Sequence, residues 1–390
     1  MNAYILSAKR TPIGAFMGGL SDFSASKLGA EAIKAAVVQS NIRKEDINEV
    51  IMGNVLTGGV GQAPARQAAI YADLPNSVEC STINKVCGSG LKSVMLAEQA
   101  IRCGDSEVIV AGGQESMSNS PYFLQKARSG YKMGNSELID MMIYDGLWDI
   151  YSQSHMGLLA EKCASEYNIS RQEQDEYAVI SYRRALEAQS NGYFADEIVP
   201  IKASIGKESL SIEKDEEPEK VKFEKIPYLK PVFKQDGTIT AANASSIDDG
   251  AAALVVASET YVQQNNLKPL AKIVAHASFS GAPEWFTIAP VSAIKKVLKK
   301  ANLEINDIDL FEINEAFAVV PIYAMKTLNI PVDKINISGG AVSLGHPIGA
   351  SGARILTTLI YALRRMNKKL GIASLCIGGG EAVAMIIEVL

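Results

Sequence analysis

The chain has 390 residues, of which 47% are hydrophobic and 21% charged, so it can bury a large core and is too long for one small module. Its 38 Lys and Arg residues against 43 Asp and Glu give a formal net charge of −5, which disfavours a general binder of nucleic acid or of anionic membranes. Ordinary Gly and Pro contents and the lack of a long apolar run exclude collagen, extensive disorder and membrane spans.

The first residues, MNAYILSAKRTP, lack the patterns of signal and transit peptides, so we expect a cytoplasmic protein. Five short apolar runs follow along the chain and predict buried strands at residues 49–56, 106–113, 251–257, 308–314 and 371–377. Helical patterns lie between them, with apolar faces that include Leu91 and Val94 in one helix and Ile355 and Leu359 in another. This alternation of strands and helices predicts an α/β fold.

Two parts of the chain resemble each other. Residues 43–54 and 303–314 both run from a charged helix end through a strand to an Asn. At similar distances beyond them, the segments 87–90 and 349–352 each open an amphipathic helix, and each helix is followed by a strand that ends in glycines. The pattern predicts two similarly folded halves related by a pseudo-twofold, with both glycine-rich helix starts at one cleft; chance similarity of common α/β units is the alternative.

Residues 114–240 depart from this pattern. They contain several methionines, Gly/Ser-rich turns and the charged run 207–225. We expect a long insertion that carries loops over the core, where substrate contacts usually lie. Composition alone favours a solvated face for the charged run.

Cys87 is the first candidate for chemistry. It lies in INKVCGSG, directly before a glycine turn and a helix. A helix N-terminus favours a thiolate and lowers the cysteine pKa, which would make Cys87 a nucleophile; a small buried side chain is the alternative. The other cysteines that lack such a setting, Cys80, Cys103 and Cys163, are expected in the core.

Three further candidates lie in or beside turns. His346 lies in GGAVSLGHPIGASGAR, where the glycines suit a backbone close to a ligand, although a lone His is often only packed in a core. Cys376 precedes three glycines, whose N–H groups could bind an oxyanion, with a tight turn as the alternative. Asn314 could orient a water or merely cap a helix.

The five cysteines include no C-x-x-C pair, which disfavours disulfides and zinc and favours a reducing compartment. The sequence contains no G-x-x-x-x-G-K-[ST] motif, which disfavours a phosphate-binding loop.

Several motifs together resemble the thiolases over essentially the entire chain. They are INKVCGSGLK (83–92), SHMG (154–157), TAANASSIDDGAAAL (240–254), NEAFA (314–318), GGAVSLGHPIGASGAR (339–354) and CIGGG (376–380). The sequence is most similar to the acetoacetyl-CoA thiolases, or acetyl-CoA acetyltransferases, of the mitochondrial biosynthetic type. The resemblance implies a five-layered αβαβα fold and a homotetramer. It also implies an N-terminal half formed by residues 1–117 and 248–270, a loop domain at 118–247 and a C-terminal half at 271–390.

The resemblance also implies a reaction, the reversible Claisen condensation of two acetyl-CoA molecules to acetoacetyl-CoA and CoA. Cys87 would take the acetyl group while His346 accepts its proton, and Cys376 would deprotonate the second acetyl-CoA. One oxyanion hole would consist of His346 and a water held by Asn314, and the other of the backbone N–H groups of Cys87 and Gly378.

Contacts with CoA and a potassium ion are implied in the same way. CoA serves as substrate and product, with no covalently bound cofactor, and His155 and Met156 would line the acyl pocket, where Met156 favours short chains. The remaining residues of the CoA site would be Tyr182, Lys220, Val221, Lys222, Lys225, Phe233, Ser245, Ala316 and Phe317. The potassium site would consist of Tyr182, Ala241, Ala242, Ala244 and Val342. Lys222, Glu224 and Glu381 depart from the family's pattern.

Two alternatives stay open at this point. A broad-chain 3-ketoacyl-CoA thiolase of fatty-acid degradation would share the catalytic residues but have a wider pocket, which Met156 disfavours. A non-catalytic acyl-CoA-binding scaffold would have lost the reactive set, yet Cys87, Asn314, His346 and Cys376 are all present. A ketoacyl-carrier-protein synthase would need a second histidine where Cys376 stands.

Overall fold

The computed structural model describes residues 2–205 and 208–390. In this part of the chain ten strands form one hydrogen-bonded sheet, in the order β14-β15-β16-β13-β1-β12-β5-β3-β4 with β2 paired to β12. The strands on the N-terminal side are β1 (Ala3–Arg10), β2 (Gly14–Ala15), β3 (Glu49–Gly53), β4 (Glu79–Ile83), β5 (Val108–Ser116) and β12 (Asp248–Ser258). Those on the C-terminal side are β13 (Ala271–Ser280), β14 (Leu310–Ile313), β15 (Leu370–Ile377) and β16 (Glu381–Val389).

The predicted internal repeat is visible in the strand order. On the N-terminal side β4, β3, β5, β12 and β1 follow one another, with β3 parallel to both β4 and β5. On the C-terminal side β14, β15, β16 and β13 follow in the same pattern, and a parallel bridge from Phe311 to Ile335 stands where β4 stands in the first half. Within the sheet, the two halves meet where β1 pairs with β13, through Tyr4 with Lys272 and Ile5 with Ala271.

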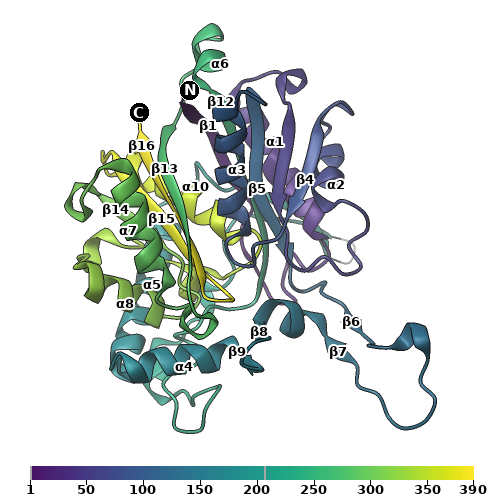
Figure 1. Ribbon diagram of the computed structural model, residues 1–390, viewed down its shortest axis with the longest axis vertical. Coiled ribbons are helices and arrows are strands. Elements are labelled where there is room, and N and C mark those ends of the chain that lie inside the picture. The colour runs from purple at the N-terminus through teal and green to yellow at the C-terminus, as the bar shows by residue number, and fades with distance from the viewer. Residues whose placement is uncertain (1, 206–207) are drawn as a thin grey trace.

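Helices cover both outer faces and fill the space between the halves (Figure 1). Helices α1 (Ala25–Ser40) and α2 (Pro64–Tyr71) pack on the N-terminal strands, and α7 (Ala289–Ala301), with α8 (Val319–Leu328) beside it, packs on the C-terminal strands. Helices α3 (Ser89–Cys103) and α10 (Ser351–Arg365) contact each other and strands of both halves. The result is the five-layered αβαβα arrangement expected from the sequence.

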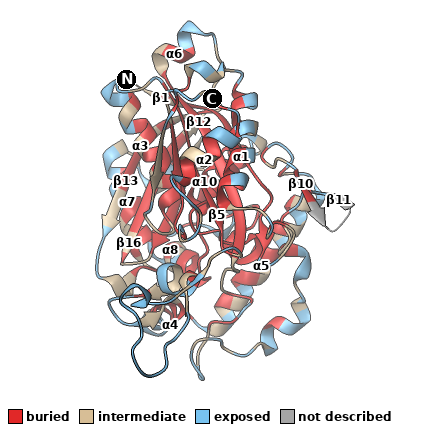
Figure 2. Cartoon of the chain, turned by 90° about the vertical axis from the view of Figure 1, so that its right-hand side faces the viewer, coloured by how far each residue is buried: buried red, intermediate tan, exposed pale blue. Residues whose placement is uncertain are grey.

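Helix α10, in the middle layer, is buried over most of its length. Every residue of α10 from Ser351 to Leu363 is buried (Figure 2). The two helices approach backbone to backbone near their N-termini, because a Cβ atom on Gly90 would lie only 2.7 Å from the Ala353 nitrogen. Glycine at this crossing therefore lets both helix starts reach the same region.

The five apolar runs predicted as strands become β3, β5, β12, β14 and β15. The sequence did not predict β4, because its residues, ECSTI, are partly exposed and form no apolar run. The expectation for Cys103 was wrong: it ends α3 and is exposed, because its side chain lies off the buried face that includes Ile101. Cys163 is buried as expected, and Cys80 is half-buried.

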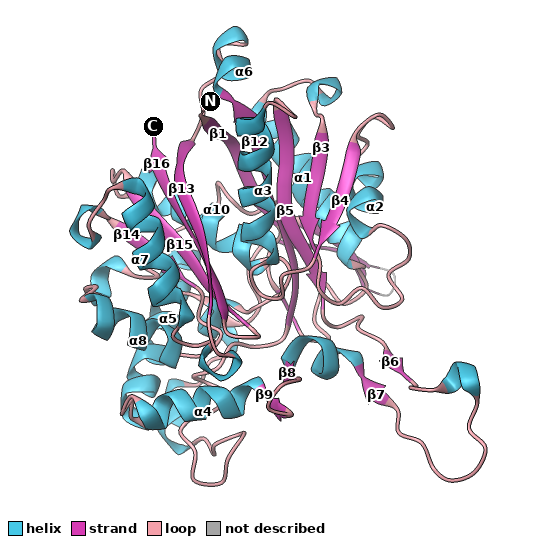
Figure 3. Cartoon of the chain, in the orientation of Figure 1, coloured by secondary structure: helices cyan, strands magenta, loops and turns pink. Residues whose placement is uncertain are grey.

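The segment between β5 and β12 extends away from the layers (Figure 3). It contains two antiparallel pairs of very short strands, then α4 (Met156–Glu166) and α5 (Arg171–Ser190), and then the hairpin of β10 (Ile201–Ile205) and β11 (Glu208–Ile212). The short pairs are β6 (Tyr122–Phe123) with β7 (Ile139–Asp140) and β8 (Trp148–Asp149) with β9 (Ser154–His155). Lys207, the first residue of the charged run, lies outside the described residues.

The remaining helices are short. Helix α6 (Glu259–Gln264) follows β12, and α9 (Ala341–Leu344) precedes α10. Helical segments of one or two turns occupy η1 (Lys44–Asp46), η2 (Ala127–Ser129), η3 (Met142–Leu147), η4 (Pro218–Lys220), η5 (Phe223–Tyr228), η6 (Pro283–Trp285), η7 (Ile305–Asp307) and η8 (Val332–Lys334). Among the described residues, no helix has both the length and the apolar character that a membrane crossing requires.

Candidate active site

Loops from both halves of the sheet meet around one cavity of about 280 Å³. Cys87 lies just before α3, Gly378 directly follows β15, and His346 lies between α9 and α10. Nine of the residues predicted for the site line this cavity: Cys87, His155, Met156, Phe233, Ser245, Ala316, Phe317, His346 and Gly378. The structure thus brings together residues that are up to 291 positions apart, from Cys87 to Gly378.

The Cys87 loop is held in a strained conformation at the start of α3. Val86 has φ 45°, a left-handed value that is unfavourable for a β-branched residue. Ser89 holds the loop, because its hydroxyl accepts from the Lys85 N–H at 2.8 Å and donates to the Val86 carbonyl at 2.7 Å. Burial raises the pKa of the Cys87 thiol to about 11, although the N–H groups of Gly378 and Cys87 itself favour the thiolate. The expected lowering of this pKa was therefore wrong. Removal of the thiolate from water raises the pKa by more than the helix N-terminus and the two N–H donors lower it.

His346 is oriented by a serine that the sequence analysis missed. The Ser351 hydroxyl donates to the Pro347 carbonyl at 2.9 Å, so it accepts from His346 Nδ1 at 2.6 Å. The proton of the neutral ring therefore lies on Nδ1, and the Nε2 lone pair faces Asn314 Nδ2 at 3.4 Å. Burial, with the nearby Arg354 charge, lowers the pKa of His346 to about 3, so the ring is neutral and can accept a proton.

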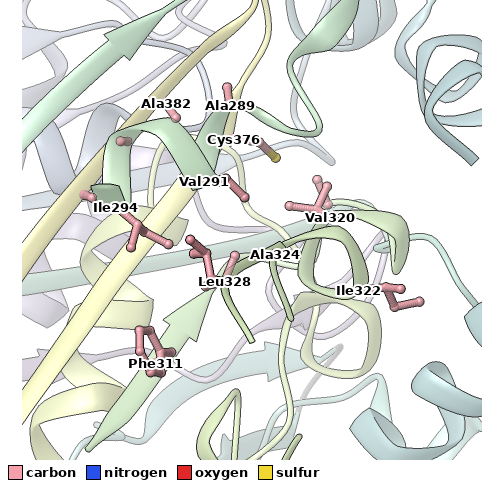
Figure 4. Packing of buried hydrophobic residues seen from close by; sticks show 14 of the residues in the cluster. Ala289, Val291, Ile294, Phe311, Val320, Ile322, Ala324, Leu328, Cys376 and Ala382 are labelled. Carbon is pink, nitrogen blue, oxygen red and sulfur yellow. The ribbon is translucent and has the colours of Figure 1, made fainter. Parts of the chain in front are cut away.

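Cys376, near the end of β15, lies in an apolar cluster. Figure 4 shows it beside Ala382, Ala289 and Val291, and its side chain is fully buried. This burial, with a smaller contribution from nearby Cys87, raises the pKa of Cys376 well above the usual value. A thiol in this setting stays protonated at rest and becomes a strong base once it has lost its proton.

Three buried carboxylates fix the loops that carry these groups, and the sequence analysis missed all three. Asp248 accepts from the His346 N–H at 2.8 Å. Glu115 accepts from the Gly349 N–H at 2.8 Å and from the N–H groups after β3. Glu315 accepts from four donors: Tyr177, Ser181, Asn336 and the Val342 N–H. The adjacent Asn314 is 1% exposed, and its Oδ1 has no protein partner among the described residues.

Aromatic and apolar side chains close the other end of the cavity. His155 caps α4, because its Nδ1 accepts from the Gly157 N–H at 3.0 Å, and its ring stacks on Phe233 with centroids 4.7 Å apart. Burial lowers the pKa of His155, so its proton lies on Nε2. The Ser245 hydroxyl donates to the Ala316 carbonyl at 3.1 Å, which ties two predicted contact segments together.

Of the six residues predicted for the nucleotide end of CoA, Ser245 lines the cavity and the other five lie outside it. Tyr182 on α5 packs with Val221 and Val342 in a small apolar cluster. Three predicted lysines, Lys220, Lys222 and Lys225, are exposed on the adjoining turns. The structure therefore places the three lysines on a surface beside α5, outside the cavity, whereas Tyr182 is buried.

The predicted potassium ligands offer oxygen atoms that no other group uses. Within the described part of the chain, no protein hydrogen bond reaches the Tyr182 hydroxyl or the carbonyls of Ala241, Ala242, Ala244 and Val342. Burial, and then the charges of Glu217, Asp248 and Glu315, raise the pKa of Tyr182. A neutral hydroxyl, four carbonyls and a negative surrounding potential suit a hard monovalent cation. No group of three or more His, Cys, Asp or Glu side chains in the described ranges could hold a metal ion.

Ten residues complete the lining. They were not predicted as acyl-pocket or CoA contacts: Val86, Met117, Gly146, Leu147, Val232, Ala244, Ser246, Ile247, Phe286 and Ile348. Five of them lie within the quoted motifs, but most are apolar side chains whose residue type does not distinguish a pocket wall from the core. Ser351 did leave a signal, since a hydroxyl at the start of a predicted helix lies five residues after the candidate His346.

Comparisons with known proteins agree with this architecture. Among curated proteins, acetyl-CoA acetyltransferase 2 of Arabidopsis thaliana is 50% identical over 389 residues, which cover 99% of this chain and 96% of that protein. The mitochondrial acetyl-CoA acetyltransferase of Mus musculus is 51% identical over 386 residues, which cover 98% and 90%.

Solved structures and family domains give the same result. A crystal structure of Acat5 thiolase from Ascaris suum in complex with coenzyme A covers 100% of both chains with a TM-score of 0.95 and 44% identity. The Bacillus anthracis acetyl-CoA acetyltransferase has a TM-score of 0.98 and 41% identity, covering 100% of this chain and 99% of the other. Residues 3–260 match the thiolase N-terminal domain and residues 267–389 the thiolase C-terminal domain. The chain belongs to the thiolase family.

Proposed function

We propose that the protein is an acetyl-CoA C-acetyltransferase, which condenses two acetyl-CoA molecules to acetoacetyl-CoA and CoA. The observation that carries this proposal is the meeting of Cys87 and the neutral imidazole of His346 at one mostly apolar cavity, with the second thiol, Cys376, buried close to Cys87. Full-length relatives named acetyl-CoA acetyltransferases support the substrate. CoA in the Ascaris suum thiolase structure supports CoA as a ligand of this chain.

In the first half-reaction Cys87 Sγ attacks the carbonyl carbon of acetyl-CoA while His346 Nε2 accepts the thiol proton. The C–S bond to CoA breaks, and the departing thiolate takes the proton of Cys376, so free CoA leaves. The enzyme then holds acetyl-Cys87, protonated His346 and the Cys376 thiolate. The raised pKa of Cys376 supports this order, because a thiol that holds its proton at rest makes a strong base after losing it.

In the second half-reaction the Cys376 thiolate removes a proton from the methyl group of a second acetyl-CoA. The resulting enolate attacks acetyl-Cys87, a C–C bond forms, and the Cys87 thiolate leaves and takes its proton back from His346. The N–H groups of Gly378 and Cys87 would stabilise one oxyanion, and Asn314, through a water, together with His346 would stabilise the other. The position of the first two donors beside Cys87 supports this assignment.

A preference for short acyl chains follows from the cavity wall. Met156 lies within van der Waals range of the loop after β15, because a Cβ atom on Gly378 would be 3.7 Å from its terminal methyl group. Phe233 and Phe317 close the same side, with ring centroids 6.1 Å apart. Thiolysis of acetoacetyl-CoA and of longer 3-ketoacyl-CoA substrates by the wild type and Cys87→Ala tests the proposal. Equal turnover of long chains would favour a broad-chain thiolase, and unchanged activity of Cys87→Ala would contradict the mechanism.

Potassium binding is part of the proposal. The Tyr182 hydroxyl and the carbonyls of Ala241, Ala242, Ala244 and Val342 would hold the ion. When bound, it would supply positive charge that fixes the 241–244 backbone. Ser245 follows that segment and lines the cavity, so an ordered backbone there would orient the CoA contact.

A homotetramer in the cytoplasm completes the proposal. The segment around β6 and β7 projects from the molecule and exposes Tyr122, Leu124, Tyr131, Met133 and Leu138. An exposed apolar segment of this kind favours contact with another copy of the chain, and sedimentation equilibrium measures the assembly.

The relatives include mitochondrial and cytosolic enzymes, so the localisation of the native protein tests the proposed compartment. The division into residues 1–117 with 248–270, 118–247 and 271–390 stays a prediction, which limited proteolysis can test.

A further inference from the structure

A charged pair links the two loops that approach Cys87 from opposite halves of the chain. The Lys85 ammonium and the Glu381 carboxylate form an ion pair. Lys85 lies two residues before Cys87, and Glu381 lies three residues after Gly378, whose N–H faces the Cys87 thiol. The side chains of the pair are 23% and 32% exposed, so they lie at the rim of the site rather than in its apolar interior.

We propose that Lys85 and Glu381 are positioning residues, which hold the Cys87 sulfur against the N–H group of Gly378. The proposal rests on the proposed function, because it assigns these residues to the same acyl-transfer site. Neither residue touches the substrate in this proposal; both act through the loops that carry the nucleophile and the oxyanion donor.

Each loop is supported within its own half, by Ser89 on one side and by the Gly281 N–H, which donates to the Gly380 carbonyl, on the other. Among the described residues, the hydrogen bond that joins the two loops is that of Lys85 with Glu381. Val86 is held at φ 45°, a conformation that is unfavourable for this residue and that the surroundings must maintain. After Gly378, the residues Gly379 and Gly380 have φ 87° and 81° and carry no side chain that could be packed. Glu381 is therefore the first side chain after the oxyanion donor that can attach this loop to the opposite half.

The two ends of the ion pair are themselves anchored. Lys85 donates its N–H to Ser89 Oγ at 2.8 Å and accepts from the Gly88 N–H at 3.0 Å, which fixes it to the start of α3. Glu381 begins β16 and pairs with Ile377 and Ser280 in the sheet. A contact between these anchors spans the cleft between the halves. A partly exposed ion pair adds little to stability, so its main effect would be geometric.

The geometric effect can be large even though the stabilisation is small. A misplacement of about 1 Å between reacting groups can lower a rate by about 100-fold. The test uses Glu381→Gln, Lys85→Met and the exchange Lys85→Glu with Glu381→Lys. Glu284→Gln is the matched control, because Glu284 forms an exposed ion pair with Lys162 elsewhere on the surface.

Two measurements are needed, kcat and KM for acetoacetyl-CoA thiolysis and the pH profile of Cys87 alkylation by iodoacetamide. We expect each single variant to lower kcat by about tenfold with little change in KM, and the exchange to recover much of the loss. Both single variants should also raise the apparent pKa of Cys87, since each would withdraw the Gly378 donor. The Glu284→Gln control should match the wild type.

The direction of the alkylation shifts separates positioning from a simple charge effect. A charge acting through space would raise the Cys87 pKa when Lys85 is lost but lower it when Glu381 is lost. Opposite shifts, or kcat values within twofold of the wild type in both single variants, would overturn the proposal. Alkylation needs no substrate, so a wild type that failed to cleave acetoacetyl-CoA would contradict the proposed function while the alkylation shifts still tested the ion pair.

Discussion

Replacing Ser351 by Ala should slow the reaction without removing any group that touches the substrate. The Ser351 hydroxyl accepts the Nδ1 proton of His346 at 2.6 Å and is itself fixed by donating to the Pro347 carbonyl. Both side chains are buried, so water cannot easily replace the lost acceptor. A buried donor without a partner costs about 1–3 kcal/mol. The tautomer that accepts the Cys87 proton has its own proton on Nδ1 and a free Nε2. Without Ser351 that Nδ1–H group has no acceptor, so the substitution destabilises the reactive tautomer.

The expected loss in kcat is about 5- to 150-fold, since about 1.4 kcal/mol corresponds to a factor of ten. Single-turnover acetylation of Cys87 by acetyl-CoA, followed by mass spectrometry, measures the affected step. Ser93→Ala is the matched control: Ser93 lies on α3 and is buried, and it donates to the Gly90 and Gly112 carbonyls at 2.7 and 2.6 Å without contacting His346. Acetylation by Ser351→Ala at more than half the wild-type rate, or an equal loss in both variants, would refute the tautomer argument.

Three further predictions concern the thiols, the pocket and the ion site. Because the pKa of Cys87 is raised to about 11, the free enzyme holds a neutral thiol near pH 7, and its alkylation rate should rise about tenfold per pH unit up to that value; a plateau near pH 8 would contradict the burial effect. Met156→Ala should raise the turnover of longer 3-ketoacyl-CoA substrates relative to acetoacetyl-CoA by about tenfold, and an unchanged ratio in a chain-length series would show that another residue sets the limit. Replacing potassium by tetramethylammonium should raise the KM for acetoacetyl-CoA in the wild type but not in Tyr182→Phe, and equal responses in steady-state assays would remove Tyr182 from the site.

Much of the architecture could be predicted because burial leaves a pattern in the sequence. Runs such as EVIMG and LGIASLCI are apolar because both faces of the strand are covered, and they became β3 and β15. The repeat was detectable because both halves use the same strand and helix order. Strand β4 was not predicted, because it is partly exposed and an exposed strand needs no apolar run.

The groups with a recognisable local setting could be predicted, whereas those that act through distant contacts could not. Cys87 and His346 lie in glycine-rich turns, and Cys376 lies near the end of a strand just before such a turn; all three settings can be seen in the sequence. Asp248 contacts the His346 backbone across 98 residues, and Lys85 meets Glu381 across 296. The Cys87 pKa was predicted in the wrong direction for a related reason: a helix start is visible in sequence, but the depth at which the chain buries it is not.

The glycine crossing of α3 and α10 limits how the two halves can diverge. Cys87 precedes one helix and His346 the other, so a side chain added at Gly90 would push the helices apart and separate nucleophile from base. A duplicated gene normally frees one copy to drift, yet here each copy supplies part of a single reaction centre. Substitutions in one half are therefore acceptable only if they preserve its fit to the other, and the two repeats must evolve as one unit.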